Sequence, residues 1–594
     1  MGGDLAVTSG GTITQTGVVS VTGASTLNSG GSAITLANVN NDFGGAVTAT
    51  GGALSLADVN GLTAHLTSTS TTLSAGGALV ADGAMTGAVN VTAASADVEQ
   101  SGALTVHLNN VGSAIVKSNA ALHVDGNSTG NVTANGSTVT LGGGALNVGG
   151  NLSATSSAGD ITQAAALTVA GTSTLAAGTG NVTLATTGNA LTGAVTASGA
   201  NVTLVDASAL SAHLAANGSA TLTSSSGLTV DGSANALTLT GTSVAFGPGG
   251  TTVTGALTTN GGGVSQTGNL SVGGLSTFNA GSGDILLAAP GTNLQGAITA
   301  TGHTISLTDA HAIDANITAT GDVTLSSTGD VTTHGSYGGG LKVSGADVTL
   351  NQGTLATPLV LPGKLEVTST GDTTLTYITA TGAQVATGGT LLLDGTLKST
   401  GGDVTLAGNA IQGVNKLGAI DAAAGAKVSL DTSGGNGNIG KATTAAGVID
   451  DDAIIALLGV SGQSGLSVKF GGGQSAWFRV ASQQQTPLLQ PQSSNASQTF
   501  FCDATTCVNV LGQTTAIADS VIANILTSAS QDAADAAFGT ENLDFAIRKG
   551  YVTTIGRVPP GIDEIAGDLG ATPCDSRVTS PTAIAAEKAC SAGK

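Results

Sequence analysis

The stretch that decides the fold is Thr-Ile-Thr-Gln at residues 12–15, because related stretches return along the chain. Residues 160–163 read Asp-Ile-Thr-Gln, residues 263–266 read Gly-Val-Ser-Gln, and a weaker copy, Asp-Val-Glu-Gln, occupies residues 97–100. Successive glutamines of this set are 85, 63 and 103 residues apart. Each spacing is close to a whole multiple of about 21 residues, a length typical of one coil of a repeat protein. The sequence therefore predicts stacked coils, or rungs, of this length.

The register of the repeat holds over long stretches. Residues 43–47 (Phe-Gly-Gly-Ala-Val) match residues 191–195 (Leu-Thr-Gly-Ala-Val) at an offset of 148, and Asp58 matches Asp206 at the same offset. An insertion within the block would break this offset. The constant spacing therefore indicates that each rung is held in place by its neighbours.

Each rung is made of short runs in which Val or Leu alternates with Thr or Ser, as at residues 53–56, 181–184 and 403–406. Period-two alternation indicates strands, and the Gly, Asn and Ser pairs between the runs indicate turns. Strands this short bury a face only when equivalent strands stack above and below them. We therefore predict an all-β protein, a right-handed parallel β-helix (a solenoid), followed by a small, partly helical, disulfide-bearing C-terminal region.

Composition agrees with this fold. Aromatic residues make up 2% of the 594 residues, too few for an ordinary globular core, and charged residues make up 9%, too few for disorder driven by charge repulsion. Low-complexity disorder is the alternative, but the in-register offsets argue against it. The net charge of −21 makes nucleic acid a poor partner, since binding to phosphates needs clustered Lys and Arg.

The composition shifts near residue 441. We predict a β-helix rod over residues 1–440, last rungs and a protease-sensitive segment over 441–482, a linker over 483–498 and an anchoring region over 499–594. Apolar residues at helical spacing predict a helix over 515–538. The sequence shows neither a signal peptide nor an apolar run of about 18 residues. We therefore expect a piece of a longer protein whose export signal lies elsewhere.

All four cysteines lie in the anchoring region, at Cys502, Cys507, Cys574 and Cys590. Four cysteines allow three pairings, and we favour the two local ones, Cys502–Cys507 and Cys574–Cys590. A zinc site is the rival interpretation, but Cys-x-x-Cys spacing and a nearby histidine are both missing from the sequence. Disulfides would place the region in an oxidising compartment.

Catalytic constellations are weak in this sequence. His65 and His213 share a rung position, but the predicted period puts seven rungs between them, too far for one ligand or metal. Asp58, Asp206 and Asp309 fall at turn positions, where turn-forming aspartate is the simpler interpretation. We therefore predict a protein that is not an enzyme, with no catalytic residue, cofactor or metal.

One local motif remains, Thr444-Ala445-Ala446-Gly447, followed by three aspartates. It is either a small-residue turn with a helix-capping aspartate or a site for a protease that cleaves between alanines. Residues 422–425 (Ala-Ala-Ala-Gly) are a second candidate for such a site. The place of residues 444–447 at the composition boundary, upstream of the cysteine-bearing tail, favours them as the cleavage site.

The rungs "ITQTGVVSVTGASTL", "ITQAAALTVAGTSTL" and "NDFGGAVTATGG" resemble filamentous-haemagglutinin-type repeats of two-partner-secretion exoproteins, over roughly residues 1–440. A C-terminal cysteine pair such as Cys574 and Cys590 resembles the hook by which adhesins of this family lodge in their outer-membrane transporter. With the site at residues 444–447, the chain is similar to cyclic-di-GMP-regulated biofilm matrix adhesins, which a periplasmic dialanine-cleaving protease releases.

The resemblance implies a biofilm adhesin on the surface of a Gram-negative bacterium, anchored in the outer membrane with a periplasmic hook and releasable to the matrix. Its implied partners are the secretion transporter, the protease, and an exopolysaccharide or the surfaces of other cells. Two alternatives stay open. A β-helical polysaccharide-degrading enzyme would need an aromatic- and carboxylate-lined groove, and an autotransporter passenger would need a C-terminal β-barrel.

Overall fold

The computed structural model describes residues 1–413, 418–440, 458–461, 465–470, 476–479, 499–502, 506–509 and 514–516. Every regular element within these residues is a strand, and the strands build about 23 turns of a parallel β-solenoid. The predicted all-β parallel β-helix is therefore confirmed for this part of the chain. No helix of the described residues is long and apolar enough to span a bilayer.

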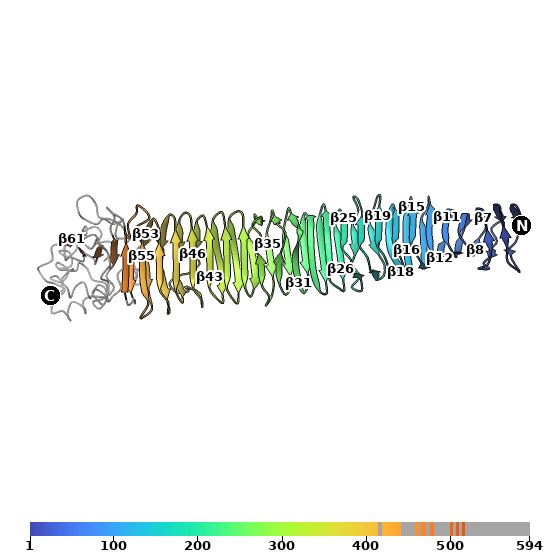
Figure 1. Cartoon of the computed structure of the whole chain (residues 1–594). Coiled ribbons are helices and arrows are strands. Elements are labelled where there is room, and N and C mark those ends of the chain that lie inside the picture. Colours follow the sequence, from blue (N-terminus) through green and yellow to red (C-terminus); the bar gives the residue numbers. More distant parts are fainter. Residues whose placement is uncertain are drawn as a thin grey trace, which may run out of the picture. The chain divides into compact units, whose positions relative to one another are not determined.

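The chain divides into two compact units, Met1–Gly296 and Ala297–Lys594. In the first unit, most successive strands alternate between two sheets, A and B (Figure 1). Strands β3 (Ser20–Val21) and β6 (Asp42–Phe43) pair with each other in a separate small sheet. Strands β7 (Val47–Thr50) and β9 (Leu62–Ser68) pair in parallel in sheet A, and β8 (Ala53–Asp58) and β10 (Ser70–Ala75) pair in sheet B. Each turn thus contributes to both sheets.

The side chains of each strand alternate between core and solvent. In β9 the pattern is buried at Leu62, Ala64 and Leu66 and exposed at Thr63 and His65. Val, Leu, Ile and Ala fill the narrow interior, because strands that stack in register place like residues above one another. The apolar residues of the alternating runs therefore face the core, and the polar residues face solvent on the outer side of each sheet.

The length of a turn varies along the solenoid. Val47 pairs with Ala64 on one side and with Ser25 on the other, and the step in sequence to Ala64 is clearly the shorter of the two. In the second unit Leu341 pairs with Leu365, which is a longer step than either. The predicted constant rung length is therefore wrong. Loops at the corners lengthen or shorten without disturbing the strand register, so the sequence period is an average of unequal turns.

The copies of the Thr-Gln stretch alternate between the two sheets. Gln15 follows β2 (Ile13–Thr14) and Gln163 ends β20 (Ile161–Gln163), both in sheet B. Gln100 ends β13 (Ser95–Gln100) and Gln266 ends β33 (Val264–Gln266), both in sheet A. The strand order gives four and a half, three and a half, and five and a half turns between successive glutamines, where the sequence predicted four, three and five.

Long strands of the first unit bend at a glycine. Strand β29 (Gly227–Ala234) pairs with β31 (Ser243–Val253), and the register shifts between Val230 and Gly232. Gly232 has φ of 97°, and a Cβ there would meet the backbone of Leu214 on the preceding turn. Only glycine fits a left-handed conformation this close to another backbone. The bend lets one strand cover two sides of the turn.

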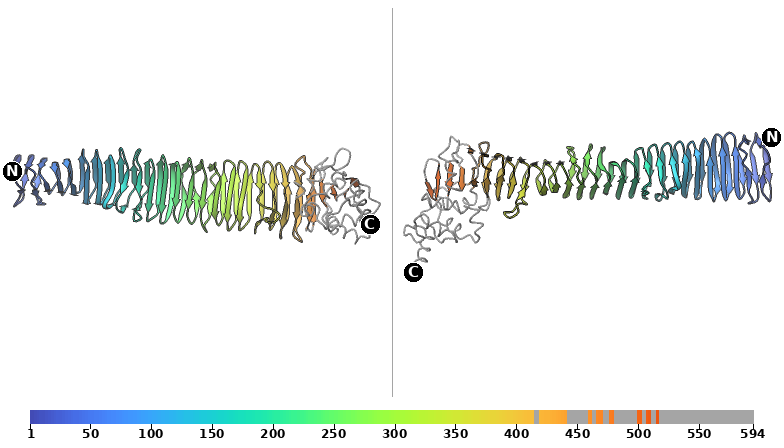
Figure 2. Two further views of the ribbon diagram at one scale, coloured as in Figure 1. Left: turned by 180° about the vertical axis from the view of Figure 1, so that it is seen from behind. Right: turned by 90° about the horizontal axis from the view of Figure 1, so that it is seen from below.

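The second unit is also built of stacked parallel strands (Figure 2), and its described residues include a further sheet of nine strands. Strand β55 (Lys427–Asp431) pairs in parallel with β57 (Gly465–Lys469), and β59 (Thr499–Cys502) pairs antiparallel with β60 (Thr506–Asn509). Residues 514–516 form the strand β61, so the helix predicted from residue 515 does not begin there. The rest of that helix, the linker over 483–498 and the motif at 444–447 lie outside the described residues.

Candidate functional site

The recurring glutamine holds adjacent turns together from inside the corner. The Nε2 of Gln163 donates to Oδ1 of Asn189 at 2.8 Å, and the Nδ2 of Asn189 donates back to Oε1 of Gln163 at 2.8 Å. Gln15 and Asn41 make the same pair at 2.8 and 2.9 Å. We call this reciprocal amide pair the clasp. Its two residues are 26 positions apart in both copies.

The asparagine of the clasp is buried and uses its amide fully. Asn189 also accepts the backbone N–H of Leu167 at 3.0 Å and donates to the carbonyls of Leu184 and Val205 at 3.4 and 3.0 Å. In the third copy Gln266 donates to the hydroxyl of Thr292 at 2.7 Å. Buried polar groups are retained when they are satisfied in this way. The Thr-Gln stretch is therefore a structural device.

The recurring aspartates are structural as well. The carboxylate of Asp206 is fully buried and accepts the backbone N–H of Leu191 at 2.7 Å and that of Ser208 at 2.6 Å. Asp58 accepts the N–H groups of Phe43 and Asn60 at 2.8 and 2.6 Å. Each aspartate closes its own turn and ties it to the preceding one. The prediction of turn-forming aspartates is confirmed for both residues.

On the outer surface, three histidines each meet an aspartate one turn further along. His65 Nδ1 lies 2.6 Å from Asp82 Oδ1, and His213 Nδ1 lies 2.5 Å from Asp231 Oδ1. A third pair joins His107 to Asp125. We call these the His–Asp pairs. In each pair the two residues are directly opposite in the strand register of adjacent turns.

In a His–Asp pair, the carboxylate orients the imidazole ring through one ring nitrogen. The other ring nitrogen is then able to exchange a proton. The register places Thr48 and Thr196 on the other side of His65 and His213. Within the described residues, no hydrogen bond joins either threonine hydroxyl to its histidine. Neither threonine is therefore held against its histidine in the way of a nucleophile and its base.

The two histidines that share a repeat position are far apart, as the sequence predicted. His65 and His213 both lie in sheet A, and the strand pairings place eight turns between them, not seven. The separation is about 38 Å at 4.8 Å per turn. Sequence reasoning missed their aspartate partners, although each partner lies one turn ahead in the sequence and can be found once the true turn length is known.

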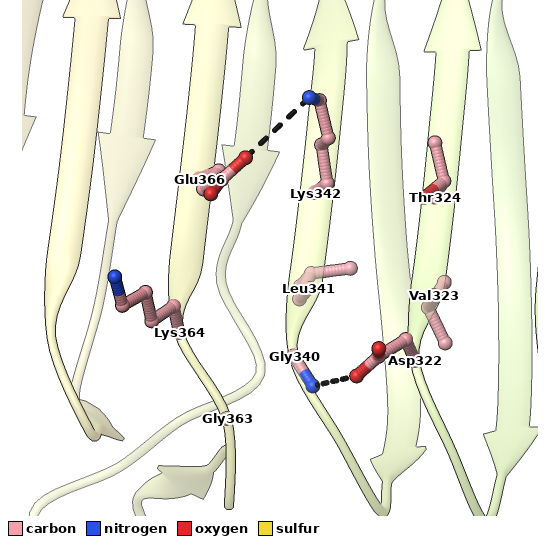
Figure 3. A pocket seen from close by; sticks show the side chains of 9 residues that line it. All are labelled: Asp322, Val323, Thr324, Gly340, Leu341, Lys342, Gly363, Lys364 and Glu366. Atoms are coloured by element: carbon pink, nitrogen blue, oxygen red, sulfur yellow. Dashed lines mark hydrogen bonds and ion pairs between the residues drawn. The ribbon is translucent and has the colours of Figure 1, made fainter.

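The second unit has a shallow depression of about 280 Å³ on sheet A (Figure 3). It lies over β41 (Val323–Ser327), β43 (Leu341–Gly345) and β46 (Leu365–Ser369). The Nζ of Lys342 pairs with Oε2 of Glu366 at 3.4 Å, and Asp322 accepts the N–H of Gly340 at 2.7 Å. Lys364 has no ion-pair partner among the described residues. The lining therefore contains two lysines and two carboxylates, and their formal charges balance.

Two shifted pKa values lie elsewhere in the second unit. Burial raises the pKa of the Tyr337 phenol, against the hydrogen bond with Thr333 at 2.8 Å that lowers it. The pKa of Asp431 is lowered, because hydrogen bonds from Ser433 and the charge of Lys469 outweigh burial, which raises it. Tyr337 lies in β42 (Val331–Tyr337), Asp431 ends β55, and neither lines the depression.

The sites predicted from the sequence fall in the tail. Cys502 and Cys507 lie directly opposite each other in the antiparallel pair of β59 and β60. The other two cysteines, Cys574 and Cys590, and the motif at residues 444–447 lie outside the described residues, so their pairing and cleavage stay predictions. Within the part of the chain that the structure describes, no cluster of three His, Cys, Asp or Glu could hold a metal ion.

Comparison with known proteins gives one match. A family model described as "Repeats of unknown function (DUF5649)" matches residues 1–50, 129–198 and 234–301. No curated protein and no solved structure matches the chain. Each matched stretch contains one glutamine of the Thr-Gln stretch and its partner on the next turn, namely Gln15 and Asn41, Gln163 and Asn189, and Gln266 and Thr292. Over these three stretches the chain is similar to that family of repeats.

Proposed function

We propose that this chain is the C-terminal part of a large bacterial surface adhesin of the biofilm matrix. The observation that carries the proposal is a solenoid with outward-facing polar groups at matching repeat positions, such as the His65–Asp82 and His213–Asp231 pairs of sheet A. A surface that repeats a weak site gains avidity without any strong individual site. This is the physical requirement for adhesion to a repetitive partner such as an exopolysaccharide or the surface of another cell.

The depression in the second unit supports a glycan ligand. Lys342 and Lys364 bring two positive charges to this area, and Asp322 and Glu366 bring two negative charges. Glu366 already pairs with Lys342, so Lys364 is the cation left for a ligand. An acidic sugar carries a carboxylate for the lysines and hydroxyls for the carboxylates. The resemblance to two-partner-secretion exoproteins supports the same class of ligand.

Retention at the cell is proposed for the anchoring region, residues 499–594. A disulfide between Cys574 and Cys590 would form the hook that lodges in the outer-membrane secretion transporter. We expect Cys574→Ser to shift the protein from the cell fraction to the medium while the protease is blocked, with Ser580→Ala as the matched control. Retention of the Cys574→Ser variant at wild-type levels would overturn the hook.

Release is proposed at Thr444–Gly447. A periplasmic protease that cleaves between Ala445 and Ala446 would separate the solenoid from its hook. An Ala445→Arg/Ala446→Arg variant should stay with the cells when the protease is active. The same change at another dialanine, Ala533→Arg/Ala534→Arg, should leave release unchanged. Equal release of the first variant and the wild type would reject this site.

A further inference from the structure

Sheet B of the first unit carries a single column of threonines over eight consecutive turns. We call it the threonine column; its members are Thr140, Thr162, Thr183, Thr203, Thr221, Thr238, Thr258 and Thr277. Each threonine is the direct register partner of the next, in strands from β18 (Thr138–Val148) to β35 (Ser276–Asn279). All eight side chains point outward, between buried residues of the same strand.

The spacing of the column is set by the strand pairing. Adjacent strands lie about 4.8 Å apart, so eight levels span about 34 Å. Threonine is stiff at χ1 because it is β-branched, and close neighbours above and below restrict it further. The hydroxyl and methyl groups of the column therefore form a rigid row with a fixed repeat.

Most of the hydroxyls in the column are not used by the protein. Thr140 and Thr162 share one hydrogen bond of 3.3 Å. From Thr183 to Thr277, no column hydroxyl bonds to another protein atom within the described residues. A hydrogen bond between column hydroxyls therefore links only one pair of adjacent turns among the eight described levels. The remaining hydroxyls face solvent as an ordered set.

The face around the column is almost uncharged. Two residues after each column threonine the chain has uncharged residues, which include Thr223, Thr240, Asn260 and Asn279. Two residues before each column threonine the only charged residue is Asp160. Sheet A differs at the same turns, because His213 and Asp231 lie in direct register in one of its outward columns. The neutral face thus contrasts with both the charged sheet A and the net charge of −21. Its complement is a neutral, periodic surface.

We propose that the threonine column binds ice. An O–H···O hydrogen bond is about 2.75 Å long, and tetrahedral geometry then places second-neighbour oxygens of ice about 4.5 Å apart. The column repeats at about 4.8 Å, so waters held by successive hydroxyls adopt nearly the spacing of an ice surface. The rigid side chains order these waters with little further loss of entropy. The ligand is therefore a water lattice, and this inference does not depend on the anchoring hook.

The test is partition of the full chain between a slowly growing ice front and the liquid. The wild type should concentrate in the ice. Thr203→Lys/Thr221→Lys, which places two charges at adjacent levels of the column, should be excluded from it. The matched control is Thr174→Lys/Thr196→Lys, which changes two outward threonines at adjacent levels of sheet A and should partition like the wild type. Circular dichroism and thermal unfolding check that all three proteins are folded.

Three results would overturn the proposal. The first is exclusion of the wild type from ice, the second is equal incorporation of the Thr203→Lys/Thr221→Lys variant, and the third is an equal loss in the sheet A control. Retention of the wild type on insoluble cellulose or chitin, together with exclusion from ice, would assign the column to a crystalline glycan instead.

Discussion

Gln163 and Asn189 are 26 residues apart in the sequence, yet their amides exchange two hydrogen bonds of 2.8 Å across successive turns. Gln15 and Asn41 repeat this relationship eight turns earlier. The polar residues that recur most clearly in the sequence are thus explained by the fold. Function must be sought on the outward faces, where the repeat presents groups to solvent.

Removal of the clasp should destabilise its turns. Asn189→Ala leaves the Gln163 amide and the Leu167 N–H without their partner, and each unsatisfied buried group costs about 1–3 kcal/mol. We expect a loss of about 2–4 kcal/mol from these groups, measured as faster hydrogen exchange in β20 and β23 (Val182–Leu184). Exchange reports local opening, which suits a solenoid whose turns contact only their neighbours.

The control for the clasp is Asn147→Ala, since Asn147 is exposed and its amide bonds only to Asn127. This variant should exchange like the wild type. Equal protection in the Asn189→Ala and Asn147→Ala variants would show that the clasp does not hold the turns.

Loss of the buried aspartate should be costly. Asp206→Ala removes the acceptor for Leu191 N–H, Ser208 N–H and the Ser208 hydroxyl, and hydrogen bonds to charged groups contribute about 1.5–3 kcal/mol each. The expected outcome is a fall in the urea midpoint of unfolding. The exposed Asp314 provides the comparison, because Asp314→Ala removes a carboxylate that is mostly in water. Similar midpoints for the two variants would contradict the structural role of Asp206.

The bend at Gly232 should not accept a side chain. Gly232→Ala adds a Cβ at φ of 97°, against the backbone of Leu214, and the left-handed conformation alone costs about 1–2 kcal/mol. We expect a clear fall in the unfolding temperature. Gly17→Ala should have little effect, since a Cβ there meets no atom within 4 Å. An unfolding temperature for Gly232→Ala as high as that for Gly17→Ala would refute the bend.

Acid should weaken the turn closed by Asp431. The folded-state pKa of this carboxyl is lowered by Ser433 and Lys469 against the raising effect of burial, so the carboxylate stabilises the fold above its unfolded pKa of about 3.9. That contribution is lost as the pH falls through the lower folded-state pKa. Asp431→Asn should therefore lower the unfolding temperature at pH 7 and have a smaller effect near pH 3. A difference that stays constant with pH would reject the linkage.

The sequence predicted the parallel solenoid correctly because alternation along each strand and stacking of like residues are both visible in one chain. It gave the wrong turn length because the strands of sheets A and B share the same alternating pattern. The sequence therefore does not distinguish a copy on the opposite sheet from a copy on the same sheet. The spacing from Gln163 to Gln266 predicts five turns, but the strand order gives five and a half.

The surface features needed the register itself. The pairing of His65 with Asp82 depends on a turn that is shorter than the average period, and the threonine column depends on seven successive pairings of unequal length. Corner loops absorb these differences, so an average period cannot align the columns. The tail predictions rest on the local spacing of the cysteines, on the place of residues 444–447 at the composition boundary and on the family resemblance.

The most direct test of the adhesin is attachment of the producing cells to a surface or to each other. A strain whose protein lacks this chain should lose attached biomass relative to the wild type, and restoring the chain should restore it. Immunoblots of the cell fraction must show the wild-type protein at the surface in the same cultures. Equal attachment of the two strains, with the wild-type protein displayed, would contradict the proposal.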